Sequence, residues 1–161
     1  MILTGKIQWK CNRARHARRG TTLIEAAIGL WFTCTVIIGC IDFSMATMKT
    51  EALNHVAHRV GRAAIIHGQF ATANYNGGAW GPTTDTTLMN SSSPIAGVAR
   101  QYRAGLKPDL VTIKLSWPKG NNNPGSAVLV ETSMKWAPVF LDQLGFGLIT
   151  LRGRSYQIIQ H

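Results

Sequence analysis

The residues best placed to do chemistry lie at the start of an apolar run, in the stretch RRGTTLIEAAIGLWFTC from residue 18 to residue 34. Glu25 is charged, and the residues after it carry no charge until Asp42. A carboxylate in an apolar setting is costly when it is alone and tolerable when it has a partner or reaches the membrane headgroups. Glu25 is therefore either a paired group inside a membrane or an interfacial residue.

A second group of residues that could do chemistry is Glu51, His55 and His58. Their helical spacing could place three metal ligands on one helix face. The sequence has no second cluster that would supply the missing ligands. A solvated helix face is the better interpretation, so we expect no metal and no other cofactor.

Other catalytic signatures are weak. Ser116 and Lys119 have Ser-x-x-Lys spacing, but they end a predicted strand at a proline and the companion motifs are absent. No Gly-rich phosphate loop follows a strand. Three tryptophans could form a binding patch, although such residues more often pack in a core or near a membrane: Trp80, Trp117 and Trp136. We expect a protein that is not an enzyme.

The charge of the chain is concentrated at one end. Six lysines and arginines precede Gly20 with no acid among them, and without them the net charge of +10 falls to +4. A basic tail directly before an apolar run is typical of a cytoplasmic flank under the positive-inside rule. We therefore assign the charge to membrane topology rather than to phosphate binding, and expect no nucleic-acid partner.

The apolar run predicts a membrane-spanning helix. Residues 26–41 are free of charge but slightly short for a span, and continuing through Asp42 to Met48 reaches the usual length. At about 1.5 Å of rise per residue, Glu25 and Asp42 are roughly 25 Å apart, so each can lie near an interface. We expect residues 21–48 to cross the cytoplasmic (inner) membrane once, with the N-terminus in the cytoplasm and the lipid bilayer as a partner.

Three kinds of processing compete for this N-terminus. A secretory signal peptide would end at the small residues of 44–46, but the run is long and has no helix break before them. The sequence IIGC of 37–40 resembles a lipobox, which would make Cys40 the lipidated first residue of an envelope lipoprotein with a ligand-binding domain. The third kind of processing depends on a resemblance at Gly20.

Gly20 followed by TTLIE resembles the prepilin cleavage signal of type IV pilins and pseudopilins. The resemblance implies that a prepilin peptidase removes the leader, including Arg18 and Arg19, by cutting after Gly20. Thr21 would then carry a cationic α-amine, and Glu25 of one subunit could pair with that amine on a neighbour when spans pack in a filament. Thr21 differs from the residue commonest at this position in pilins.

Later blocks extend the resemblance. GCIDFS at 39–44 and ALNHVAHRVGR at 52–62 precede VTIKLSWP at 111–118 and WAPVFL at 136–141, and together these blocks resemble the TadE-like family. The similarity covers most of the chain apart from 70–93, although the proline that the family often has early in the span is absent. It implies a minor pilin or pseudopilin in Flp/Tad pilus assembly or secretion, with other pilins and a membrane assembly platform as partners.

The chain after the span predicts an amphipathic helix and then a small helix. Apolar residues recur at helical spacing to about His67, and Gly68 is a plausible stop. Residues 68–93 are rich in Gly, Asn, Thr and Ser, so we expect a loop there. Ser93 resembles an N-cap of a helix that ends near Gly105.

Three runs then predict an antiparallel sheet, LVTIKLSW, SAVLVETSMKW and LITLRGRSYQII, with a turn at GNNNPG between the first two. The expected fold is α+β and pilin-like: a long N-terminal helix, half membrane-spanning and half amphipathic, packed on this sheet. The expected divisions are a basic cytoplasmic leader (1–20), the span (21–48) and an extracytoplasmic domain (49–161). Five charged residues should lie on the solvent face of the sheet: Lys114, Glu131, Lys135, Arg152 and Arg154.

Overall fold

The computed structural model describes residues 13–71, 78–143, 145 and 147–160, which form a long helix and a small sheet. The first helix, α1, runs from Arg13 to Ile66. The chain divides into two compact units, Met1–Cys40 and Ile41–His161, so α1 contributes to both. From Gly20 onwards α1 is long and apolar enough to cross a membrane.

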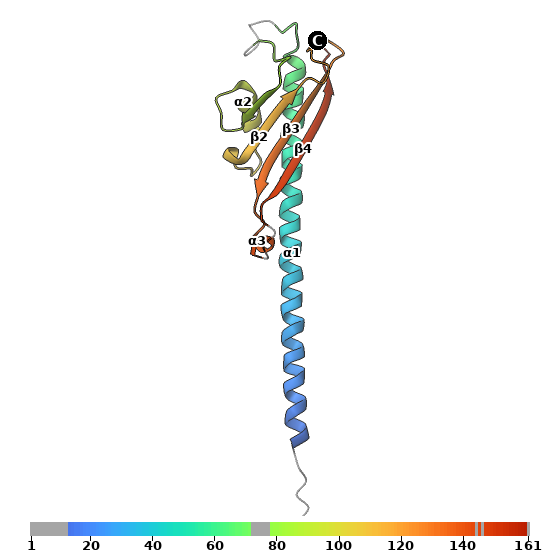
Figure 1. The fold of residues 1–161 in the computed structure, drawn as a ribbon, viewed down its shortest axis with the longest axis vertical. Coiled ribbons are helices and arrows are strands. Elements are labelled where there is room, and N and C mark those ends of the chain that lie inside the picture. The colour runs from blue at the N-terminus through green and yellow to red at the C-terminus, as the bar shows by residue number, and fades with distance from the viewer. Residues whose placement is uncertain (1–12, 72–77, 144, 146, 161) are drawn as a thin grey trace, which may run out of the picture. The chain divides into compact units, whose positions relative to one another are not determined.

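The sheet belongs to the second unit and has four antiparallel strands in the order β1-β2-β3-β4. The strands are β1 (Asp85–Leu88), β2 (Val111–Ser116), β3 (Ala127–Trp136) and β4 (Ile149–Ile158). Helix α2 (Pro94–Gln101) and a 3-10 turn, η1 (Pro108–Leu110), connect β1 to β2, and α3 (Val139–Gln143) connects β3 to β4. The sheet lies across the C-terminal part of α1 (Figure 1).

The core lies between α1 and one face of the sheet. The buried stripe of α1 recurs every three or four residues, as expected for one face of a helix: Leu53, Val56, Ala57, Val60 and Ala64. Alternate residues of the two central strands complete the core: Val111, Ile113 and Leu115 of β2 with Val128, Val130 and Met134 of β3. This period-two burial is why the two runs form strands with one face on the helix.

Two small residues of the sheet let α1 approach its backbone closely. A Cβ atom at Gly153 would lie 2.6 Å from the backbone N of Asn54 and 2.6 Å from the carbonyl C of Leu53. The buried Thr132 hydroxyl donates to the Leu53 carbonyl at 3.1 Å. Because both contacts involve helix backbone, larger side chains here would push α1 off the sheet.

The predicted α+β architecture is confirmed, with a long N-terminal helix on an antiparallel sheet. The three expected strands appear within one residue of their predicted ends, and α1 ends at Ile66. The five charged residues predicted for the solvent face are exposed or half-buried. Lys114, Glu131 and Arg154 are cross-strand neighbours, and Arg154 Nε lies 3.5 Å from Glu131 Oε1.

Two predictions for the connecting segments were wrong. The expected loop at 68–93 contains a strand, β1, with the sequence Asp-Thr-Thr-Leu. β1 is a short edge strand that pairs only with β2, and none of its residues is buried. Helix α2 ends at Gln101 rather than near Gly105, although Ser93 is its N-cap residue as predicted, without a side-chain capping hydrogen bond. Helix α3 was not predicted.

Gly153 provides a test of the close approach. Gly153→Ala should lower the free energy of unfolding by about 2 to 3 kcal/mol, because the added methyl group meets helix backbone that cannot rotate away. Gly97→Ala is the matched control, since it lies in α2 with nothing within 4 Å of an added Cβ, and it should be neutral or stabilising. Thermal unfolding of the full chain in detergent measures both, and equal stability of the two variants would contradict this packing.

Candidate functional site

The first unit presents an apolar helix surface with no buried residue among those described. The large side chains there are mostly exposed, with Leu23 at 72%, Trp31 at 71% and Phe32 at 64%. An exposed apolar surface of this extent needs lipid or another protein to cover it. The candidate functional site is therefore the surface of this helix segment rather than an enclosed cavity.

Hydroxyl groups within the segment are satisfied by the helix itself. Thr33 Oγ1 donates to the Gly29 carbonyl at 2.8 Å, and Thr35 Oγ1 donates to the Trp31 carbonyl at 2.9 Å. A hydroxyl that bonds to the carbonyl four residues earlier exposes no unsatisfied donor. The polar residues of this segment are thus compatible with a setting that lacks water.

Glu25 differs from these threonines because the described part of the helix does not supply its side chain with a hydrogen-bond partner. Its carboxylate has no hydrogen bond or ion pair with any residue that the structure describes. The side chain is exposed and lies with Thr21, Ile24 and Ile28 around a shallow hollow of about 290 Å³. Thr21 and Glu25 are four residues apart, so they lie on the same face of α1.

The other predicted processing residues lie on the same helix. Gly20 is exposed, and a Cβ there would have nothing within 4 Å. Arg18 and Arg19 are helical, and their side chains lie outside the described set. The helix thus brings Thr21 and Glu25 to one face, while cleavage after Gly20 and the pairing of Glu25 with a neighbouring amine stay predictions.

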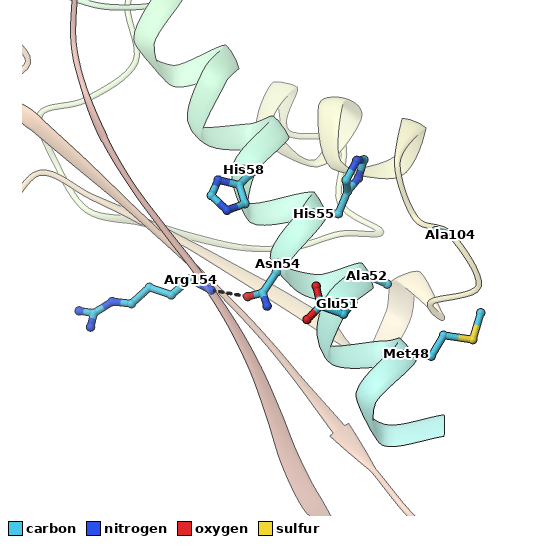
Figure 2. A pocket seen from close by; sticks show the side chains of 8 residues that line it. All are labelled: Met48, Glu51, Ala52, Asn54, His55, His58, Ala104 and Arg154. Carbon is cyan, nitrogen blue, oxygen red and sulfur yellow. Dashed lines mark hydrogen bonds between the residues drawn. The ribbon is translucent and has the colours of Figure 1, made fainter. Parts of the chain in front are cut away.

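The second unit has an open groove beside α1, with a volume of about 620 Å³ (Figure 2). Four of its residues recur along one side of the helix: Glu51, Asn54, His55 and His58. Asn54 Oδ1 accepts a hydrogen bond from the backbone N–H of Arg154 at 3.2 Å, which ties the helix to β4 (Figure 2).

Both histidines of the groove have packing or hydrogen-bond partners. His58 Nδ1 lies 3.1 Å from the Ser155 hydroxyl, and the His55 ring meets the Tyr102 ring edge-on at 5.9 Å. Within the described part of the chain, no three His, Cys, Asp or Glu side chains come together as a metal site would need. The groove is therefore a polar helix surface that also holds β4 and Tyr102.

The three tryptophans singled out in the sequence do not form a surface patch. Trp80 and Trp117 are buried, and Trp136 is half-buried. Trp80 stacks on His67 with ring centroids 4.4 Å apart, while Trp117 lies so close to Gly81 that a Cβ there would be 2.5 Å from its ring. These residues therefore serve packing.

In the Ser-x-x-Lys pair, the serine makes a hydrogen bond within the sheet. Ser116 Oγ donates to the Leu129 carbonyl at 3.3 Å across the β2–β3 ladder, and Lys119 is exposed. The serine hydroxyl is therefore used within the sheet, and these contacts give the pair no nucleophilic arrangement.

Asp42 has a structural role that its sequence context did not indicate. This residue is only 3% exposed. Its Oδ1 accepts the backbone N–H of Val139 at 3.2 Å, and its Oδ2 accepts that of Phe140 at 2.8 Å. Asp42 thus supplies the acceptors for the first turn of α3, which has few intrahelical partners of its own.

Comparisons with protein-family models, curated proteins and solved structures find no match.

Proposed function

We propose that this chain is a TadE-like minor pilin or pseudopilin that acts in assembly of a Flp/Tad-type pilus or a related envelope secretion machine. It works by packing its N-terminal helix against the helices of other subunits. In this proposal residues 1–20 are a cytoplasmic leader, residues 21–48 cross the inner membrane, and residues 49–161 lie outside the cytoplasm.

The observation that carries the proposal is the isolated carboxylate of Glu25 on an exposed apolar helix. No described residue pairs with it, and the surrounding surface of Ile24 and Ile28 is apolar. A carboxylate in such a setting is stabilised by a partner from outside the chain. The α-amine that cleavage after Gly20 would create is a partner of the right charge, at the right depth, on every neighbouring copy.

The charge distribution supports the same topology. All the basic residues before Gly20 would stay in the cytoplasm, as the positive-inside rule favours. The partners that follow are a prepilin peptidase, other pilins or pseudopilins, the assembly platform and the lipid bilayer. None of these roles needs catalysis by the chain itself.

Processing provides the first test. In cells that contain the peptidase, the mature chain should begin at Thr21, and Gly20→Leu should retain the leader because the residue before the cut has changed. Intact mass spectrometry of membrane extracts measures both. Equal masses for the wild type and the variant would contradict cleavage after Gly20, and a lipid on Cys40 would instead indicate an envelope lipoprotein.

Glu25 provides the second test. Glu25→Gln should leave insertion and leader removal intact but reduce assembly with partner pilins by tenfold or more, because each packed amine would lose a counter-charge worth a few kcal/mol. Chemical crosslinking and pilus yield, normalised to processed protein in the membrane, measure the effect.

Glu51→Gln is the matched control for that substitution. Glu51 is another exposed carboxylate on α1 and lies outside the apolar segment, so its loss should leave assembly unchanged. Normal crosslinking and piliation with Gln at position 25 would exclude the pairing role and leave Glu25 as an interfacial residue.

A further inference from the structure

The contact between Asp42 and α3 fixes a distant part of the chain to the start of the second unit. Val139 and Phe140 follow Asp42 by 97 and 98 residues, yet both donate backbone hydrogen bonds to its carboxylate. Helix α3 lies beside α1 at the end of the sheet where β3 stops and β4 begins (Figure 1). The depth of residue 42 in a membrane therefore sets the depth of the first turn of α3.

Residue 42 lies within the last two turns of the proposed span, directly after the charge-free run that ends at Ile41. A bare carboxylate there would face a large desolvation cost. Two backbone N–H donors compensate that charge, as they do for carboxylates at helix N-termini. These two hydrogen bonds let the Asp42 side chain lie at the edge of the bilayer while it holds α3 there.

The residues around this contact are apolar and exposed. On α1 they are Ile41 (51% exposed), Phe43 (73%) and Met45 (46%). On the segments that flank and begin α3 they are Val139 (67%), Leu148 (65%) and Ile149 (36%). We call these six residues the apolar collar.

The arrangement of the collar indicates what covers it. Ile41 and Phe43 are two residues apart and point to different sides of α1. Val139 at the start of α3, with Leu148 and Ile149 around the start of β4, adds further exposed apolar surface. A single protein partner would cover one side, whereas a bilayer surrounds the helix. The proposed span contains the three collar residues of α1, and this continuity favours the same occupant.

We propose that the apolar collar rests in the outer leaflet of the bilayer, so that α3 and the start of β4 form a second membrane contact clamped by Asp42. Because the collar meets lipid only if α1 spans the membrane, the inference rests on the proposed function. The second unit would then be held close to the membrane surface at two points rather than by α1 alone.

The test uses the full chain in vesicles that contain brominated phosphatidylcholine, with a fluorescent NBD group on a single cysteine. Cys11, Cys34 and Cys40 are first replaced by serine, and cysteine is then placed at one of three exposed positions. Leu148 reports the collar, Ile37 reports the span, and Ile158 at the far end of β4 is the matched control.

If the collar lies in lipid, bromolipid should quench NBD at Leu148 and at Ile37 by about twofold or more, and should leave NBD at Ile158 unchanged. The reason is that interfacial apolar residues lie about 5–10 Å below the membrane surface. Adding Asp42→Asn should reduce quenching at Leu148 but not at Ile37. Quenching at Ile37 without quenching at Leu148 would overturn the inference and leave the span intact. No quenching at Ile37 would overturn both, and quenching at Leu148 that survives Asp42→Asn would overturn the clamp.

Discussion

A carboxylate in an apolar helix is costly unless it has a partner or reaches the membrane headgroups, and α1 has two such groups. Asp42 has its partners within the same chain, the backbone N–H groups of Val139 and Phe140. Glu25 has none among the described residues. Asp42 belongs to the unit that contains the sheet and α3, whereas Glu25 belongs to the unit formed by Met1–Cys40.

The same helix has to serve two environments, and its composition changes accordingly. Before Cys40 its large apolar residues face outward, and its threonine hydroxyls bond to its own carbonyls. From Leu53 onwards the apolar residues form one buried stripe, and polar side chains such as Asn54 and His58 bind the sheet. The close approach at Gly153 and the Thr132 hydrogen bond to the Leu53 carbonyl hold this second part in register with β3 and β4.

Much of this fold could be predicted because its signals are local. Alternation identified the three longer strands, and helical spacing of Leu53, Val56 and Val60 identified the buried face of α1. β1 gave no such signal, since its side chains are exposed or half-buried and its strand state comes from pairing with β2. The contact of Asp42 with α3 joins residues 97 positions apart, so no local pattern could indicate it.

The candidate site could also be predicted only where its signals are local. The glycine, the arginines and Glu25 could be found from their spacing at the start of an apolar run, but their proposed partners are other molecules. A single chain therefore shows that Glu25 has no partner among the described residues, and the proposed partner belongs to another subunit. By contrast, the sequence spacing of Glu51, His55 and His58 resembled that of metal ligands. In the fold, His58 and His55 make a hydrogen bond and a ring contact with neighbouring residues.

The most direct measurement is photocrosslinking from Ile28, which is 63% exposed and lies in the same hollow as Glu25. A benzoylphenylalanine at this position, in cells that express the partner pilins, should crosslink to the N-terminal helix of another subunit and give a species whose mass is the sum of the two subunit masses. Crosslinks to lipid alone, with the chain remaining at monomer mass, would contradict the claim that this helix face packs against another subunit.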